Sequence, residues 1–168
     1  MKIGYHNGGG RGMEQNPFLK EAMIEAKISE SCDEVPVGAV IVRNNEIIAR
    51  GHNLKEDLKD CTAHAEIMAI REASQKLDSW RLSDCDLYVT LEPCAMCAGA
   101  ILSSRIRRVF IGAFDGTAGA CGSVINVLQN DALNKWTEVI WLYDSECGEI
   151  LTNYFKKKRV GVKRWLGL

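Results

Sequence analysis

Apolar residues recur at helical spacing in some segments and at strand spacing in others, and this alternation predicts the order of secondary structure. The segment "NPFLKEAMIEAKIS" predicts a helix, with Asn16 at its N-cap and Pro17 at its first position. The two β-branched runs of "VGAVIVRNNEIIARGHN" predict a hairpin that turns at its paired asparagines. A second helix is expected from Thr62, a good N-cap residue, to about Lys76.

The remaining segments continue to alternate between strand and helix. "DLYVTLE" predicts a buried strand, "CAMCAGAILSS" a helix and "IRRVFIGAF" a further strand. After the glycine-rich loop "DGTAGACGS", we expect a short helix in "VINVLQND", a strand in "TEVIWLY" and a terminal amphipathic helix in "SECGEILTNYFKKKR". Strands that alternate with helices favour an α/β fold, a three-layer α/β/α sandwich around a mostly five-stranded sheet.

Length and composition are those of one ordinary soluble domain. The chain has 168 residues, of which 46% are hydrophobic and 26% are charged. We interpret residues 1–12, which hold five glycines, as a flexible leader or cloning remnant. Residues 13–168 are then the single domain.

Charge and cysteine content limit the class of protein further. No apolar run is long enough to span a bilayer, and no secretory leader is found. A formal net charge of −1 argues against a broadly basic nucleic-acid-binding surface, although a local patch stays open. Seven cysteines without an export signal indicate thiols or metal ligands in a reducing compartment. We therefore expect a cytoplasmic protein that does not enter membranes.

The candidate chemistry is concentrated in two short motifs. In "EPCAMC", Cys94 and Cys97 are three residues apart, so on a helix both thiols face one direction. Pro93 suits a helix start, and that end of a helix favours thiolates, the form that zinc binds. We expect both cysteines in the first turn. His64 lies at the start of the second predicted helix, and two such helix starts can meet at one edge of a sheet.

One histidine and two cysteines leave a fourth tetrahedral position for water, which is the pattern of a catalytic zinc site. Zinc lowers the pKa of its water towards neutrality. Glu66, two residues after His64, points in a different direction and is a candidate to move that proton. Three alternatives stay open: a redox Cys-x-x-Cys pair, a closed structural site completed by Cys61 or Cys121, and an ordinary capping or core role for His64.

His-x-Glu followed by Pro-Cys-x-x-Cys is the signature of zinc-dependent nucleobase deaminases. The wider segments "EVPVGAVIV", "GHN", "TAHAEIMAI", "LYVTLEPCAMCAGAI", "SRIRRVFIGA" and "GSVINVL" resemble the bacterial tRNA-specific adenosine deaminases, from Pro17 to Arg159. The resemblance implies a cytidine-deaminase-like fold with a mixed central sheet, and a homodimer with one Zn2+ per subunit. It also implies that the wobble adenosine of a tRNA anticodon stem-loop is converted to inosine.

The resemblance assigns roles by matching position. It makes His64, Cys94 and Cys97 the zinc ligands and Glu66 the proton shuttle. It implies that Asn53 and the Ala65 backbone N–H contact the substrate base, in a pocket walled by Pro36, Val37 and Leu91. It implies that Asp115 contacts the neighbouring nucleotide. The residues implied to contact the RNA backbone are Lys156, Lys157, Lys158 and Arg159. The same residues also suit plain turns, an ordinary core and a solvated helix face.

The chain departs from the family at two points near the expected substrate. His52 stands where some relatives have Trp, and Phe114, rather than a basic residue, adjoins Asp115 and could stack on a base. The alternative function is deamination of a free base or nucleotide of the guanine or cytosine type. A further alternative is a catalytically idle, zinc-containing RNA-binding subunit, against which the presence of Glu66 argues.

Overall fold

The computed structural model describes residues 16–165, with the backbone alone for residues 160–165. The predicted leader, residues 1–12, and the predicted domain start at residue 13 lie outside the described residues. The elements in chain order are α1 (Pro17–Ser31), β1 (Gly38–Arg43), β2 (Glu46–His52), α2 (Lys55–Leu58), α3 (Ala65–Lys76), β3 (Cys85–Leu91), α4 (Ala95–Ser104), β4 (Arg108–Ala113), β5 (Glu138–Trp141) and α5 (Ser145–Trp165). Within this described part, no helix has the length and apolar character needed to cross a membrane.

The strands form one mixed sheet in the order β2-β1-β3-β4-β5. β1 pairs antiparallel with β2 and β3, whereas β3, β4 and β5 run parallel to one another. β2 and β3 therefore run in the same direction, and their C-terminal ends lie at the same edge of the sheet. The predicted five-stranded mixed sheet is confirmed.

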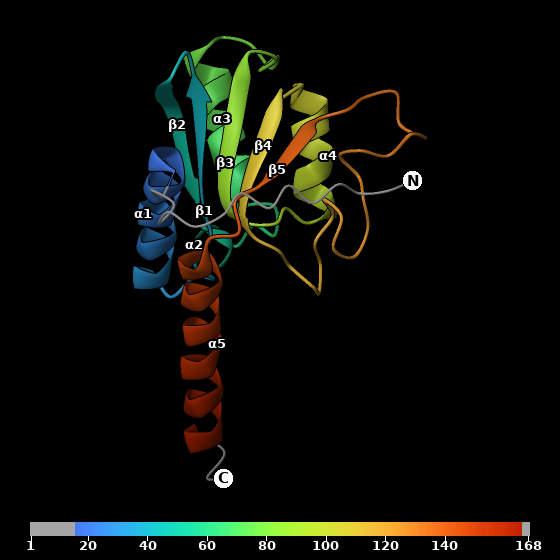
Figure 1. The fold of residues 1–168 in the computed structure, drawn as a ribbon. Helices are drawn as coiled ribbons and strands as arrows, with labels where there is room; N and C mark the ends of the chain where they lie inside the picture. The colour runs from blue at the N-terminus through green and yellow to red at the C-terminus, as the bar shows by residue number, and fades with distance from the viewer. Residues whose placement is uncertain (1–15, 166–168) are drawn as a thin grey trace.

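Helices cover both faces of this sheet, as Figure 1 shows. α3 and α4 pack over the main core, which is built around the fully buried Ile41, Leu87 and Ile111. α1 and the first turns of α5 cover the other face, where the rings of Tyr88 and Phe110 stack with centroids 4.3 Å apart. The predicted three-layer sandwich is confirmed, and the rest of α5 extends away from the sheet.

Local side-chain chemistry explains the two elements that open the described chain. The Asn16 side chain caps α1 by accepting hydrogen bonds from the N–H groups of Phe18 (3.0 Å) and Leu19 (3.3 Å). Asn44 and Asn45 have φ of 51° and 63°, the pair of left-handed conformations that a two-residue type I′ turn requires. The predicted cap and the predicted hairpin are both confirmed.

The second predicted helix begins three residues later than expected, because Thr62 does not cap it. α3 starts at Ala65, and His64 is its N-cap. The carboxylate of Asp60 accepts hydrogen bonds from the Thr62 N–H (2.8 Å) and hydroxyl (2.7 Å). The prediction was wrong because this local turn satisfies the Thr62 side chain instead of the helix.

Residues 124–131 form turns, so the short helix predicted there is wrong. Leu128 is fully buried and Val127 packs against the main core. The apolar pattern thus reflects a loop that folds onto the core. Two smaller differences are the short helix α2, which was not expected, and α5, which continues beyond Arg159 to Trp165.

Backbone contact sets the distance between α3 and the sheet. At Gly51 on β2, a Cβ would overlap the Ala65 carbonyl oxygen and would lie 2.6 Å from the Ala69 nitrogen. Ala65, Ala69 and Ala73 recur one turn apart on α3 and are all fully buried. Because these residues are small, the start of α3, with His64, lies directly on the strand.

Candidate active site

Two helix starts bring the predicted metal ligands together at the edge of the sheet where β2 and β3 end. His64 is the N-cap of α3, and Cys94 is the N-cap of α4, with Cys97 in its first turn. Neither side chain makes the usual N-cap hydrogen bond, and the imidazole and the Cys94 thiol face each other. The expectation that both cysteines lie inside the first turn is wrong by one residue for Cys94.

The three donor atoms are separated as the ligands of a tetrahedral ion are. His64 Nδ1 lies 3.7 Å from Cys94 Sγ and 3.6 Å from Cys97 Sγ, and all three atoms lie within 4.8 Å of one another. Bonds of about 2.0–2.1 Å for Zn–N and about 2.3 Å for Zn–S place tetrahedral N and S ligands about 3.6 Å apart. The group could therefore hold a metal ion, and its donor set fits zinc.

Protons are held unequally within this group. Hydrogen bonds from Cys97 and His64 lower the pKa of the Cys94 thiol to about 3. The neighbouring Cys94 and burial raise the pKa of the Cys97 thiol. The hydrogen bond with Cys94 also raises the pKa of His64. Cys94 is thus the readiest thiolate, and a bound metal would displace protons from the other two groups.

Glu66 lies on the first turn of α3 and is only 4% exposed. Burial raises the pKa of its carboxyl to about 7, against the opposing effects of a backbone hydrogen bond and of the charge on His64. A carboxyl that titrates near neutral pH can both accept and donate a proton, as a shuttle must. The environment of Glu66 therefore suits the role predicted for it.

A closed structural site finds little support in the positions of the other cysteines. Among the described residues, the cluster that could hold a metal contains neither Cys61 nor Cys121. Cys61 is exposed, and the buried Cys121 directs its thiol to the Pro93 carbonyl oxygen at 3.9 Å. All seven cysteines are free thiols. The arrangement favours three ligands and an open fourth position.

Asn53 and Ala65 are brought together, but they bind each other. The Ala65 N–H donates to Asn53 Oδ1 (2.9 Å), and Asn53 Nδ2 donates to the Val35 carbonyl oxygen (3.0 Å). The first N–H of α3, expected to reach the base, is therefore satisfied by Asn53. The second amide hydrogen of Asn53 has no partner among the described residues, and this residue is 8% exposed.

The three predicted wall residues belong in part to the core. Pro36 and Val37 are buried just before β1, and Leu91 ends β3 half-buried. Val37 lies in the main core, against which Leu91 packs. The Asn53 N–H donates to the Val37 carbonyl oxygen (3.3 Å), which connects this segment to the predicted base contact. The core role is present, and the wall role stays a prediction.

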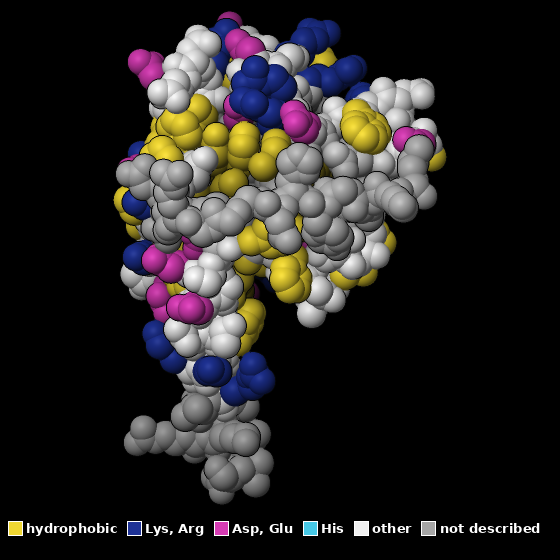
Figure 2. Space-filling model, in the orientation of Figure 1, with side chains coloured by type: hydrophobic (Ala, Val, Ile, Leu, Met, Phe, Trp, Pro, Cys, Tyr) yellow, Lys and Arg dark blue, Asp and Glu magenta, His cyan; other side chains and the backbone are white. Residues whose placement is uncertain are grey.

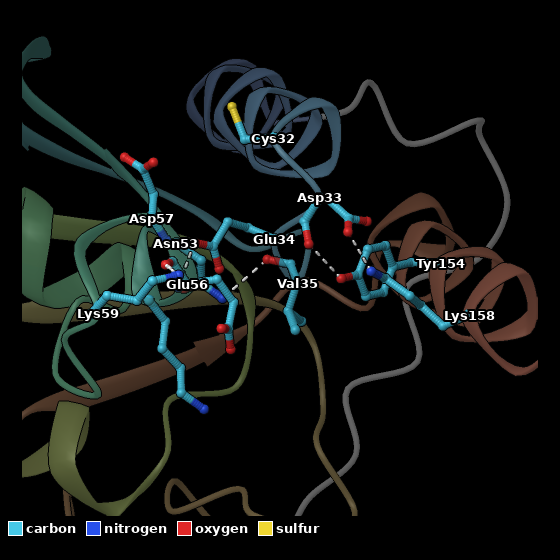
Figure 3. Close-up of a pocket in the computed structure, with 11 residues that line it drawn as sticks. Cys32, Asp33, Glu34, Val35, Asn53, Glu56, Asp57, Lys59, Tyr154 and Lys158 are labelled. Atoms are coloured by element: carbon cyan, nitrogen blue, oxygen red, sulfur yellow. Dashed lines mark hydrogen bonds and ion pairs between the residues drawn. The ribbon is translucent and has the colours of Figure 1, made fainter. Parts of the chain in front are cut away.

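A cavity of about 570 Å³ lies beside Asn53, between α2, the end of α1 and α5 (Figure 3). None of the predicted metal ligands lines it. Figure 3 shows Tyr154 and Lys158 directed towards Asp33, whose carbonyl oxygen accepts from the Tyr154 hydroxyl (2.9 Å) and whose carboxylate pairs with Lys158 (2.6 Å). The cavity is thus a neighbour of the candidate site and not the site itself.

The four residues predicted for the RNA backbone are exposed on α5, where Figure 2 shows Lys and Arg side chains gathered on the part that extends from the sheet. Lys157 pairs with Glu30 (2.9 Å), and Lys158 pairs with Asp33 (2.6 Å). The other two, Lys156 and Arg159, have no ion pair among the side chains that the structure describes. Half of the basic run is therefore neutralised within the chain.

Asp115 closes a turn, as its alternative interpretation expected. Its Oδ1 accepts hydrogen bonds from the Thr117 N–H (2.8 Å), the Thr117 hydroxyl (2.6 Å) and the Ala118 N–H (3.2 Å). Burial alone raises the pKa of this carboxyl, but the three hydrogen bonds outweigh it and lower the pKa. Phe114 beside it is 65% exposed. Contact of either residue with a nucleotide stays a prediction.

Glu92 is a further residue of this region, not predicted from the sequence. This residue is 2% exposed, and its carboxylate accepts three hydrogen bonds from backbone N–H groups. The available signal was a carboxylate between a buried strand and Pro93, where no local partner is in reach. A buried acid of this kind needs partners from a distant segment.

Comparison with known proteins agrees with this geometry. The family model of the MafB19-like deaminases matches residues 13–159. The tRNA-specific adenosine deaminase of Bacillus subtilis (strain 168) is 48% identical over 143 residues, which cover 84% of this chain and 89% of that protein.

Two solved structures extend the comparison to the fold. One, from work on A-to-I editing by tRNA:A34 deaminases at the wobble position of transfer RNA, has a TM-score of 0.77 and 45% identity, and the match covers 80% of this chain and 98% of that chain. The guanine deaminase of Nitrosomonas europaea has a TM-score of 0.71 at 24% identity, covering 83% of this chain and 84% of that chain, and shows a shared fold alone. The predicted cytidine-deaminase-like fold is confirmed.

Proposed function

Because this chain belongs to the tRNA-specific adenosine deaminases, within the MafB19-like deaminase family, we propose that it converts the wobble adenosine of a tRNA anticodon to inosine. The observation that carries the proposal is the group of His64, Cys94 and Cys97 at zinc-like separations, beside the buried carboxyl of Glu66. The reaction consumes water and releases ammonia.

One Zn2+ per subunit fits the donor set of this group. When bound, zinc supplies a Lewis acid that makes water nucleophilic near neutral pH. Glu66 takes the proton that the water loses and gives it to a ring nitrogen of the adenine. It then takes the second proton from the hydroxyl group added at C6 and gives it to the amino group, which leaves as ammonia.

Asn53 orients the base. Its amide is fixed by the Val35 carbonyl oxygen and the Ala65 N–H, so its second amide hydrogen has a defined direction in which to donate to a purine acceptor. To contact the base, the Ala65 N–H donates to the base as well as to Asn53 Oδ1, or in place of it. Three apolar residues form the walls of the base pocket: Pro36, Val37 and Leu91.

The anticodon loop suits this site because its bases can leave the stack at low energetic cost. Lys156 and Arg159 contact phosphates directly. Lys157 and Lys158 exchange their exposed ion pairs, which stabilise the fold little, for phosphates. Asp115 lies against the neighbouring nucleotide. We infer that the protein acts in the cytoplasm, because its proposed substrate is a tRNA.

We infer a homodimer with α4 at its interface. The α4 sequence "AMCAGAILSS" has no charged side chain, Ala95 is exposed, and Gly99 and Ala100 are half-buried. Val124 and Ile125, in the loop bridged to the start of α4, are 52% and 50% exposed. Exposed apolar residues of this kind suit an interface between two copies of the chain. Light scattering should give the mass of two chains of 18.7 kDa each, and a monomer at micromolar concentration would contradict the inference.

Inosine at the wobble position of an anticodon stem-loop is the test of the proposed function. The protein should convert the stem-loop and leave free guanine, cytosine and nucleosides largely unreacted. Faster turnover of a free base or nucleotide would overturn the tRNA assignment. RNA binding without ammonia release from any substrate would support an idle RNA-binding subunit. Glu66→Ala should retain zinc and lose turnover, and an active Glu66→Ala variant would sink the mechanism.

A further inference from the structure

The carboxylate of Glu92 is bound entirely by the backbone of one loop, residues 114–126 (the flank loop). Oε2 accepts the Asp115 N–H (3.0 Å), and Oε1 accepts the N–H groups of Cys121 (2.9 Å) and Ser123 (3.1 Å). The residue is 2% exposed, so these bonds are shielded from water. One side chain thus holds the two ends of the loop segment that carries Asp115.

The flank loop is also joined to the segment that carries a predicted metal ligand. The Ala120 N–H donates to the Pro93 carbonyl oxygen (2.9 Å), and Cys94 forms an isolated bridge with Gly119. A Cβ on Gly119 would overlap the Glu92 carboxylate, so the loop backbone rests directly on that carboxylate. The position of the loop is therefore set by residues 92–94.

A carboxylate suits this arrangement better than a neutral side chain. Three N–H donors converge on two oxygens, and hydrogen bonds to a charged acceptor are shorter and stronger than neutral ones. A glutamine of the same shape has only one acceptor oxygen. A carboxylate is therefore the side-chain group that can hold the flank loop, because both of its oxygens accept hydrogen bonds.

We propose that Glu92 is a positioning residue that determines which nucleotides are accepted beside the target base. It acts through the flank loop by holding Phe114 and Asp115 at a fixed distance from Cys94, and it touches no substrate itself. The inference rests on the proposed function, because the flank loop meets RNA only if the substrate is an anticodon loop. It extends that function from the reaction to the choice of sequence context.

Glu92→Gln tests one side of the contact between the Glu92 carboxylate and the flank loop. If the side-chain oxygen of the glutamine faces the N–H groups of Cys121 and Ser123, its NH2 group faces the Asp115 N–H. The hydrogen bond from the Asp115 N–H is then lost. We expect the KM for a stem-loop to rise about tenfold, as the loss of one hydrogen bond to a charged group implies. The preference for the flanking nucleotides should weaken. The kcat and the zinc content should remain close to those of the unaltered protein.

Gly119→Ala tests the same contact from the loop side. Its methyl group would overlap the Glu92 carboxylate and would lie 2.5 Å from the Asp115 carbonyl oxygen. It should therefore separate the loop from the carboxylate and reproduce the loss of flanking preference with Glu92 intact. Because both changes act on one contact, the double variant should show less than the sum of the two effects. Glu46→Gln, on the exposed hairpin, is the matched control and should alter neither KM nor preference.

Amide hydrogen exchange measures the contact between Glu92 and the flank loop without catalysis. In Glu92→Gln, the Asp115 amide should exchange faster than in the unaltered protein, while the Cys121 amide should not. If the unaltered protein makes no inosine, the proposed function fails, and the exchange rates still show whether Glu92 holds the flank loop. Unchanged exchange at Asp115, or unchanged KM and flanking preference, would overturn the inference. Parallel loss of kcat and zinc with the preference intact would overturn it too.

Discussion

The metal-capable group and the basic run of α5 are both predicted from sequence, yet the structure uses their charges in opposite ways. The donor atoms of His64, Cys94 and Cys97 converge from two helix starts at 3.6–3.7 Å. The cations of α5 lie exposed on one helix, and Lys157 and Lys158 pair with acids of the α1 end. Donor atoms that converge on one point indicate a ligand site, whereas exposed cations can be neutralised by their own chain.

The largest effect is expected from a change that leaves the metal group intact. Glu66→Gln keeps the shape of the side chain but cannot accept and donate protons as a carboxyl does. Turnover of a stem-loop should fall by about 10²- to 10⁴-fold, with zinc content unchanged. Single-turnover formation of inosine measures the rate, and a variant with more than a tenth of the original rate would remove Glu66 from the mechanism.

Loss of a predicted ligand should have the next largest effect. Cys94→Ser should lower zinc affinity by more than about 100-fold, because changes to residues that merely support ligands already cost 10- to 100-fold. Chelator competition measures this affinity. Cys61→Ser is the matched control, since this exposed thiol lies outside the group. Release of zinc from Cys61→Ser or from Cys121→Ala would indicate a closed structural site and remove the basis for catalysis.

Asp86 combines features of the metal-capable group and of α5, because it is a buried acid paired with partly exposed arginines. It is 6% exposed and accepts hydrogen bonds of 2.6–3.0 Å from Arg107 and Arg108. Asp86→Asn should reduce the free energy of unfolding at pH 7 by about 1–2 kcal/mol, a value discounted for the exposure of the arginines. Urea denaturation measures the difference.

The same ion pairs give a pH dependence of defined sign. Burial raises the pKa of the Asp86 carboxyl, but the hydrogen bonds from Arg108 and Arg107 outweigh it and lower the pKa. The charged form therefore contributes stability above the unfolded value of about 3.9, and this contribution is lost as pH falls through the lower folded value. The gap between the protein and Asp86→Asn should narrow below about pH 4. A gap that widens in acid would refute the assignment.

The smallest effect is expected on α5. Lys156→Ala with Arg159→Ala should weaken stem-loop binding several-fold, and the logarithmic slope of its salt dependence should fall by about 0.7 for each phosphate that is no longer neutralised. Lys157→Ala with Lys158→Ala should weaken it less, because those lysines must first leave Glu30 and Asp33. Glu30→Gln with Asp33→Asn should tighten binding. A larger loss of binding in the Lys157/Lys158 variant than in the Lys156/Arg159 variant would show that the ion pairs do not affect binding.

The predictable parts of the fold are those whose ends have local chemistry. Asn16 caps the helix that follows it, and Asn44 and Asn45 form the turn that joins their two strands. The errors arise where a tertiary or competing contact decides. The Asp60 carboxylate accepts the hydrogen bonds of Thr62, which therefore does not cap α3, and Val127 and Leu128 pack on the core from a loop.

The candidate site shows the same division. The spacing of Cys94 and Cys97 on one helix turn is a local property and predicts their proximity. The bond between Asn53 and Ala65, 12 residues apart, and the pairing of Lys157 with Glu30, 127 residues apart, depend on the finished fold. Glu92 carries no local signal at all, since its partners lie in a loop that follows a further helix and strand.

The contact of α3 with Gly51 also determines which substitutions the protein can tolerate. Backbone rests on backbone there, so no repacking of side chains can move the helix towards or away from the strand. A methyl group added at Gly51 displaces the helix and its histidine together. An engineer seeking a more stable variant should therefore leave this glycine unchanged.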